Sequence, residues 1–197
     1  MVKKILLLAT RNKGKEAEFK AILKNNNLKI LFLDNVKMAK QDVKETGRTY
    51  FANALIKAKF YGDKSGFLTL ADDTGLEVAA LPGKLGVKSK RFLKDSDQGR
   101  VNKLLAEMKG VSGGKRAARF VCVAVLYQPK SNNFLKALGI CQGRIGLKPK
   151  GNDGFGYDSV FVVKGLGKTM AQLTLKEKNK ISHRAKALKK LKKYLIG

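Results

Sequence analysis

The sequence predicts a mixed α/β fold in a single domain over residues 1–197. Short apolar runs alternate along the chain with apolar residues at helical spacing, which is typical of a sheet covered by helices. The apolar run at 120–127 and the segment 134–145 are separated only by a turn, so we expect them to pair as an antiparallel hairpin. The sheet therefore cannot be wholly parallel. A chain of 197 residues without linker or repeat fits one domain.

The individual elements follow from the same two patterns. Apolar runs of four to eight residues between turn residues predict buried strands, and apolar residues at i, i+3, i+4 and i+7 predict helices. The runs predict strands at 4–9, 29–33, 68–71, 76–81, 120–127, 134–145 and 160–163. The spacing predicts helices on Phe19, Ile22 and Leu23, on Phe51, Ala54, Leu55 and Ala58, on Val101, Leu104, Leu105 and Met108 up to Gly110, and on Leu188, Leu191 and Leu195.

The charge of the chain is unusual. There are 42 Lys and Arg residues against 15 Asp and Glu, which gives a net charge of +27. Such a chain should be attracted to nucleic acid, nucleotides or an anionic membrane surface. Because the lysines are spread along the whole length, we favour a lysine-rich surface over a dedicated nucleic-acid surface.

The sequence favours a cytoplasmic protein that does not span a membrane. The longest apolar run, 120–127, is too short to cross a bilayer as a helix. The start imitates a signal peptide, but its apolar part covers only 5–9 and no small-residue cleavage site follows. Cys122 and Cys141 lack zinc-site spacing and are expected to be buried thiols.

The segment 10–15, Thr-Arg-Asn-Lys-Gly-Lys, is a candidate phosphate-binding turn. It lies between an expected strand and an expected helix, where backbone N–H groups, the helix dipole and cationic side chains can meet an anion. The spacing of a Walker A loop is missing, so an ordinary basic turn fits the sequence equally well.

Two adjacent carboxylates, Asp72 and Asp73, are expected at the end of an apolar strand before a turn at Gly75. Neighbouring strand residues point to opposite faces, so only one should enter a given site. A carboxylate there can bind Mg²⁺ or activate water; the alternative is an Asx turn or a helix N-cap. Glu45 could be a second metal ligand, or simply an acid placed near a helix start.

Three further groups are candidates. Asn53 and Lys57 lie four residues apart on a helix and could face a cleft, although an exposed lysine is the alternative. In 154–158, Gly-Phe-Gly-Tyr-Asp, the glycines permit close approach, an aromatic ring can stack on a base, and the acid can bind its edge. A bulged strand start is the alternative there. His183, the sole histidine, precedes Arg184 and suits an anion or a carbonyl oxygen, or is a surface histidine.

Six segments, taken in order, resemble the inosine triphosphate pyrophosphatase family, whose members hydrolyse non-canonical purine nucleoside triphosphates. The resemblance spans nearly the whole chain. The matching segments are 8–15, Glu45-Thr-Gly47 with Asn53-Ala54 and Lys57-Ala58, 70–76, 114–120, 154–158, and Glu177-Lys178 with Ile181-Ser-His-Arg184.

The resemblance implies two α/β lobes around a long mixed sheet, with a nucleotide cleft between the lobes. It implies the reaction NTP + H₂O → NMP + pyrophosphate with Mg²⁺ as cofactor. ITP, dITP and XTP are expected as substrates in preference to ATP and GTP. It also implies a homodimer.

Site residues carry over by position. The resemblance makes Asp73 the general base, and Glu45 with Asp72 or Asp73 the Mg²⁺ ligands. A triphosphate would be held by the 10–15 turn and Lys57, while Phe155 would stack on the base. The expected substrate-binding residues are Thr10, Arg11, Asn12, Lys13, Gly14, Lys15, Lys57, Thr74, Phe155, Gly156, Tyr157, Asp158, Lys178, His183 and Arg184.

Two other functions fit parts of the sequence. The charge favours a polyanion- or nucleic-acid-binding protein on the same scaffold, with weak or no hydrolysis; the carboxylate set has no purpose in such a protein. A relative that cleaves modified pyrimidine triphosphates, as the septum-associated family does, is a third hypothesis. The intact 154–158 and 182–184 segments argue against it.

The chain departs from the family pattern mainly by gaining lysine or losing acid. Lys44 stands where the family usually has an acid, and Ala52 where it has Glu. In 82–91, Leu85 replaces a proline, Lys88 an aromatic residue and Lys90 an alanine. We expect the loss of the proline to loosen this loop, and the two lysines to alter its closure or weaken the dimer.

Overall fold

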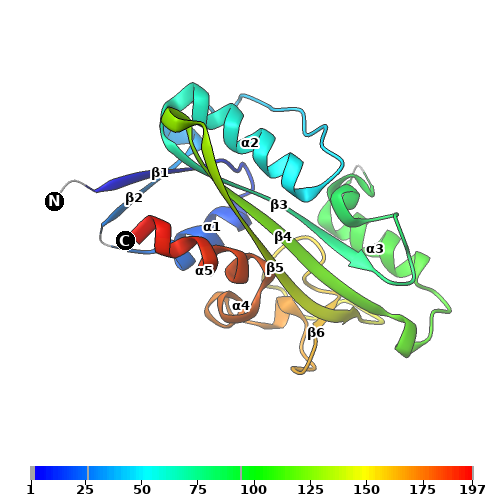
Figure 1. Cartoon of the computed structure of the whole chain (residues 1–197). Coiled ribbons are helices and arrows are strands. Elements are labelled where there is room, and N and C mark those ends of the chain that lie inside the picture. Colours follow the sequence, from blue (N-terminus) through cyan, green and yellow to red (C-terminus); the bar gives the residue numbers. More distant parts are fainter. Residues whose placement is uncertain (1–2, 26, 94, 197) are drawn as a thin grey trace. The chain divides into compact units, whose positions relative to one another are not determined.

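The computed structural model describes residues 3–25, 27–93 and 95–196, and Figure 1 labels its helices and strands. Strands and helices alternate in the first part of the chain, and two helices end it. The elements are β1 (Lys4–Leu8), α1 (Lys13–Leu23), β2 (Leu28–Phe32), α2 (Tyr50–Ser65), β3 (Leu68–Val78), α3 (Asp97–Glu107), β4 (Ala117–Gln128), β5 (Asn133–Ile145), β6 (Phe161–Val163), α4 (Leu175–Ile181) and α5 (His183–Ile196).

The strands form one six-stranded sheet in the order β2-β1-β3-β4-β5-β6. Strand β1 runs parallel to both β2 and β3, and β5 runs antiparallel to β6. Neighbours β4 and β5 are joined by the three-residue 3₁₀ turn η4 (Pro129–Ser131), which makes them a hairpin. The predicted mixed sheet is confirmed.

The chain divides into two compact units. Unit 1 takes the described residues of 1–73, 122–139 and 184–197, and unit 2 those of 74–121 and 140–183. Strands β3, β4 and β5 each contribute one part to unit 1 and the other to unit 2. Two α/β units built on a mixed sheet agree with the predicted fold class.

In unit 1 both faces of the parallel strands are covered by helices. On β1, Leu8 packs in a cluster with Phe19 of α1 and Leu188 of α5, whereas Leu7 packs in another with Ala54 of α2. Alternate residues of a strand face opposite sides, so two covered faces demand an unbroken apolar run. This requirement explains why 4–9 is continuously apolar.

Unit 2 has its own core around the far part of β3. Leu76 packs with Leu104 of α3, Tyr157 and Phe161 of β6. The rings of Phe120 and Phe161 lie 4.5 Å apart between centroids. The 3₁₀ segment η2 (Gly86–Arg91) follows Leu85, which is itself buried in this core.

The sequence prediction of two strands at 68–71 and 76–81 was wrong. The structure has one strand, β3, that runs through both aspartates, and Gly75 is buried within it without a left-handed backbone. Gly75 was read as a turn because acids and glycine are rare in strand interiors. The strand continues because cationic side chains from other elements meet the two carboxylates.

The helix boundaries also differ from expectation. Helix α1 begins at Lys13, within the segment expected to be a loop, because the Asn12 side chain accepts a hydrogen bond from Lys15 N at 2.9 Å. Helix α3 ends at Glu107, before Gly110, and α4 was not predicted at all. A capping box between Thr174 and Glu177 starts α4, a signal present in the sequence.

The expected buried thiols are confirmed, because Cys122 and Cys141 are both free and buried. Among the described residues, none of the helices combines the length and apolarity needed to cross a bilayer.

A buried arginine ties the end of the α3 region to the start of β4 in unit 2. The Arg116 guanidinium donates to the carbonyl oxygens of Ile145, Met108 and Gly146 at 2.8 Å each, and to Val111 O at 3.3 Å. Burial lowers the pKa of Arg116, as does the nearby charge of Arg144. Removing the side chain would take a buried donor from each of these carbonyl groups, although Met108 O also accepts from Val111 N at 3.2 Å.

Arg116→Met should therefore destabilise the protein by about 3 kcal/mol, the typical loss when buried polar groups become unsatisfied. Urea unfolding of the full chain measures the change. The control is Arg119→Met, which removes a half-exposed arginine that pairs with Glu77 and should cost below about 1 kcal/mol. Equal losses for the two variants would contradict the role given to Arg116.

Candidate functional site

Asp72 and Asp73 lie side by side in β3 and face opposite sides of the sheet. Asp72 follows Leu70 onto the face covered by α1 and α5, and Asp73 follows Ala71 onto the face covered by α2. This arrangement confirms that the two neighbouring carboxylates point to opposite faces of the strand. Their side chains are 1% and 12% exposed.

Asp72 is held by two cations within unit 1. Lys15 Nζ lies 2.9 Å and 3.0 Å from its two oxygens, and Arg184 Nε and Nη2 both donate to Oδ2 at 3.2 Å. The thiol of Cys122 lies 3.7 Å from the same oxygen. Glu18 of α1, also buried, pairs with Arg184. Two acids and two bases thus form a compensated buried cluster.

Burial and charge act against each other in this cluster. Burial lowers the pKa of the Lys15 ammonium, and Asp72 partly opposes that shift. Burial also works to lower the pKa of Arg184, but Asp72 and Glu18 outweigh it, so the net direction is upward. Arg184 therefore stays charged and keeps Asp72 in place.

Asp73 lies in a different environment. Asn53 Nδ2 donates to its Oδ2 at 3.1 Å, and Lys57 Nζ lies 3.8 Å from its Oδ1. The same ammonium donates to Glu45 Oε2 at 2.9 Å. Burial raises the pKa of Asp73 above its usual value; Lys57 and Lys15 lower it without cancelling the shift. A carboxylate with a raised pKa and some exposure is suited to accept a proton.

The approach of Glu45 to α2 depends on Gly47. A Cβ at Gly47 would lie 2.6 Å from Ala52 Cβ and 2.7 Å from Asn53 Oδ1, so no larger residue fits without displacement. Thr49 caps α2 by accepting from Ala52 N at 3.1 Å. Asn53 Oδ1 is buried and makes no hydrogen bond among the described residues.

The cationic side chains of the 10–15 turn pair with different acids of unit 1. Arg11 pairs with Asp42, and Lys13 with Glu16 and Asp34 at 3.2 Å and 3.0 Å. Side-chain hydrogen bonds from Asp34 and Glu16 raise the pKa of exposed Lys13.

The remaining positions of the turn form the start of α1. Thr10 is half-buried and accepts from Asn12 N at 3.2 Å, and Gly14 lies in the first turn of the helix. Of the N–H groups of this first turn, that of Lys15 is capped by Asn12 Oδ1 at 2.9 Å. Lys15, however, points to Asp72.

In unit 2, three of the predicted residues form one group, in which Phe155 and Lys178 contact the carboxylate of Asp158. Asp158 Oδ2 accepts from Phe155 N at 2.9 Å and contacts Lys178 Nζ of α4. Lys178 Nζ also lies 4.9 Å from the centroid of the Phe155 ring. Asp158 and Lys178 are buried, and Phe155 is half-buried. An aromatic face next to a buried ion pair offers stacking and polar contacts together.

The neighbouring aromatic residue, Tyr157, is buried and contributes to the packing of unit 2. Tyr157 Oη donates to Ser89 O at 2.9 Å, and burial raises the pKa of Tyr157 to about 12. Gly156 N donates to Asp97 Oδ2 at 2.6 Å. Of the two rings in 154–158, only that of Phe155 is therefore placed to stack on another ring.

His183 and Arg184 are consecutive but belong to different units. His183 is buried in unit 2 and stacks on Phe120, with the ring centroids 4.7 Å apart and 17° between the planes. The surface-histidine alternative is wrong. Arg184, fully buried against Glu18 and Asp72 in unit 1, does not present its guanidinium to solvent. Thr74, next to Asp73, is half-buried in unit 2.

Two members of the Asp72 cluster were missed as site residues. Glu18 occurs among many charged residues of α1, and only its position one residue before the core residue Phe19 could have indicated burial. Cys122 was read as an ordinary buried thiol.

Comparisons with known proteins cover almost the whole chain. The model of the Ham1 family matches residues 6–194. The chain is 40% identical over 195 residues to the dITP/XTP pyrophosphatase of Oceanobacillus iheyensis, with 98% of each covered, and 45% identical over 198 residues to that of Elusimicrobium minutum, with 95% of this chain and 98% of the relative covered. The structure of a HAM1 protein from Coxiella burnetii matches with a TM-score of 0.86 and 35% identity, covering 98% of each chain.

The environment of Asp73 gives a direct prediction. Lys57→Met removes the nearest cation, so the pKa of Asp73 should rise further and its carboxylate should protonate at higher pH. A titration of the Asp73 carboxyl ¹³C resonance measures this. Lys59→Met on the same helix, where Lys59 lies over the Tyr127 ring, is the control and should leave the titration of Asp73 unchanged. An Asp73 pKa that stays constant or falls in Lys57→Met would contradict the assignment.

Proposed function

The chain belongs to the Ham1 family, and from this we infer that it hydrolyses non-canonical purine nucleoside triphosphates. The substrates are ITP, dITP and XTP, and the products are the nucleoside monophosphate and pyrophosphate. Relatives named dITP/XTP pyrophosphatase that align over nearly their full length support this activity. The observation that carries the chemistry is Asp73, a buried carboxylate of raised pKa next to Lys57 and Asn53.

We propose Mg²⁺ as the cofactor, with Glu45 and Asp73 as its protein ligands. The described residues contain no group of three or more His, Cys, Asp and Glu side chains gathered as a metal cage. Mg²⁺ needs only one or two carboxylates besides water and substrate phosphate, so two suffice. Glu45 and Asp73 fit because they share one ammonium, Lys57, and the unpartnered Asn53 Oδ1 adds a third oxygen donor nearby.

Asp72 is not included in this ligand set. It faces the other side of β3 and is already neutralised by Lys15 and Arg184. We propose that this pairing fixes the conformation of β3, and with it the position of Asp73. Lys15 and Arg184 then act as positioning residues, which fix Asp73 through Asp72 and do not contact the substrate.

In the proposed reaction, Asp73 accepts a proton from the water that attacks the α-phosphorus. The new bond forms between that phosphorus and the water oxygen, and the bond to the oxygen bridging the α- and β-phosphorus atoms breaks. Pyrophosphate leaves with the electron pair of that bond. Lys57 stabilises the charge that develops on the phosphate oxygens, and Asn53 orients the Asp73 carboxylate. Bound Mg²⁺ would supply further charge stabilisation.

We propose that the start of α1 in unit 1 is suited to phosphate, and that Phe155, Asp158 and Lys178 of unit 2 are suited to a purine base. Thr10, Arg11, Asn12, Lys13 and Gly14 offer hydroxyl, amide, cationic and backbone N–H groups to phosphate. Phe155 would stack on the purine, with Gly156 allowing the approach. The ammonium of Lys178 can donate to the 6-oxo group of hypoxanthine or xanthine but matches the 6-amino group of adenine poorly. A homodimer and a cytoplasmic location remain predictions.

The decisive experiment measures pyrophosphate release from ITP, dITP, XTP, GTP and ATP. We expect release from the first three to exceed that from ATP by about a hundredfold, because adenine lacks the 6-oxo group, and to require Mg²⁺. The family resemblance predicts slower release from GTP as well. Asp73→Asn should lower kcat by about a thousandfold, the range expected on losing a general base. The control, Asp153→Asn at an exposed loop position, should keep full activity. Undiminished turnover in Asp73→Asn would exclude Asp73 as the base.

Gly154 provides a separate test of the base site. Its φ is +81°, and a Cβ there would lie 2.2 Å from Asp158 Oδ2, so Gly154→Ala should displace that carboxylate from Lys178. We expect the KM for ITP to rise by roughly tenfold or more. Gly165→Ala is the matched variant, because Gly165 of unit 2 is also left-handed (φ +82°) but has open space around it. Equal effects of the two variants would attribute the loss to backbone strain.

A further inference from the structure

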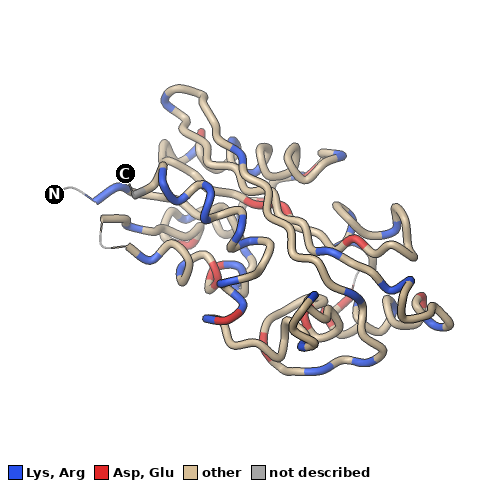
Figure 2. Tube along the Cα trace, turned by 60° about the horizontal axis from the view of Figure 1, so that its bottom comes forward, with Lys and Arg blue, Asp and Glu red and all other residues tan. Residues whose placement is uncertain are grey.

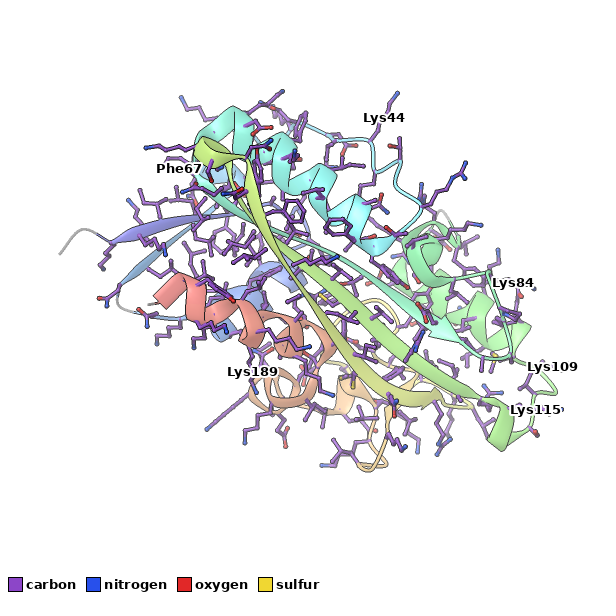
Figure 3. The ribbon with its side chains drawn as sticks, in the orientation of Figure 1. Lys44, Phe67, Lys84, Lys109, Lys115 and Lys189 are labelled. Atoms are coloured by element: carbon purple, nitrogen blue, oxygen red, sulfur yellow. The ribbon has the colours of Figure 1, made fainter. Side chains whose placement is uncertain are left out.

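A basic hollow on unit 2 is lined by none of the residues assigned above to catalysis or substrate binding. It has a volume of about 550 Å³ and is lined by η2, α3 and the segment before η2. Figure 3 labels one of its lining residues, Lys84, beside α3. The charged and aromatic lining residues are Lys84, Lys88, Arg91, Phe92, Lys103 and Glu107.

The charges of this lining are unbalanced. Glu107 is its one acid, and it already pairs with Lys84. Lys103 donates to Phe92 O at 2.9 Å. The exposed side chains of Lys88 and Arg91 have no hydrogen bond or ion pair with any described residue. Lys88 and Arg91 thus have no acid partner among the described residues, and Lys103, which contacts only uncharged groups of Phe92, lines the same hollow.

The chemistry of the lining favours phosphate groups without recognition of a base. The aromatic residue of the lining, Phe92, already has a cation beside its ring, with Lys103 Nζ 4.6 Å from the ring centroid. No carboxylate is free to accept a hydrogen bond from a base edge, since Glu107 is engaged by Lys84. Separate cations around an open hollow suit several successive phosphates of a chain better than one enclosed nucleotide.

The charge of the whole chain supports a long polyanion as the ligand. At +27, the protein attracts nucleic acid from a distance, and Figure 2 shows Lys and Arg on nearly every part of the trace. Diffuse charge alone gives binding with no preferred location. The hollow supplies a location, because its cations converge on one concave surface.

We propose that this hollow is a binding site for the phosphate backbone of single-stranded nucleic acid, independent of base sequence. Lys88 and Arg91 make the main phosphate contacts, and Lys103 contributes at the edge of the hollow. Both main contacts lie on the segment where the chain departs from its family pattern by gaining Lys88 and Lys90.

The test is the fluorescence anisotropy of a labelled 20-nucleotide single-stranded DNA of mixed sequence, titrated with the full-length protein at several salt concentrations. The variant is Lys88→Glu with Arg91→Glu. The control is Lys148→Glu with Lys150→Glu, at two exposed lysines elsewhere in unit 2. Each double variant lowers the net charge by the same amount, so only the location of the change differs.

We expect the hollow variant to weaken binding by about tenfold or more, and to reduce the slope of log K against log salt by about 1.4, the value for two phosphate contacts on a single strand. The control should lose far less affinity and keep its slope. Equal losses in the two variants would show diffuse surface attraction and overturn the proposal. Displacement of the DNA by an equimolar amount of inorganic tripolyphosphate would also overturn it, because the hollow would then be a site for a compact anion.

Hydrolysis of ITP separates this proposal from the enzymatic one. The hollow variant should release pyrophosphate within about twofold of the unaltered chain, because none of its residues belongs to the Asp73 or Asp158 groups. Thermal melting of both variants verifies that they are folded. A folded hollow variant that keeps its hydrolysis and its DNA affinity would refute the binding site and leave the enzyme intact.

Discussion

The site depends on the burial of two adjacent carboxylates, Asp72 and Asp73, inside β3. A buried ionised carboxylate without a partner costs several kcal/mol, and breaking a buried pair typically costs about 3–5 kcal/mol. The chain meets this cost for Asp72 with Lys15 from α1 and Arg184 from α5. Segments from the start and the end of the chain are therefore fixed to the same strand by charge as well as by apolar packing.

The alternation of a strand then gives the two acids different properties. On one face, Asp72 and Glu18 are balanced by Lys15 and Arg184, so this cluster carries no net charge. On the other face, Asp73 and Glu45 share a single cation, Lys57. Burial raises the pKa of Asp73 because its compensation is incomplete. Two residues of one type, adjacent in sequence, thus acquire different electrostatic environments, one fully compensated and one with a raised pKa.

The sequence predicted the fold class, the hairpin, the family and most of the clustered residues, because apolar periodicity and short motifs are local signals. It predicted a break in β3 because Asp-Asp-Thr-Gly has the composition of a turn. The partners that keep β3 extended come from α1, α2 and α5, and no local rule indicates them. The burial of Arg184, His183 and Glu18 was missed for the same reason, since a charged helix residue looks exposed until its long-range partner is known.

The chain contains few acids, which makes the excess negative charge at Asp73 and Glu45 unusual. With 15 acids against 42 bases, a surface carboxylate has cations all around it, yet Asp73 and Glu45 keep one more negative charge than their local cation supplies. Replacement of either acid by lysine would have removed that charge; at position 44 a lysine already stands where the family usually has an acid. A divalent cation is bound by a local excess of negative charge, even in a protein whose net charge is +27. The same local excess repels a polyanion. We therefore expect metal at the Asp73 group and nucleic acid at the basic hollow, because local charge balance, and not the total charge, selects the ligand at each site.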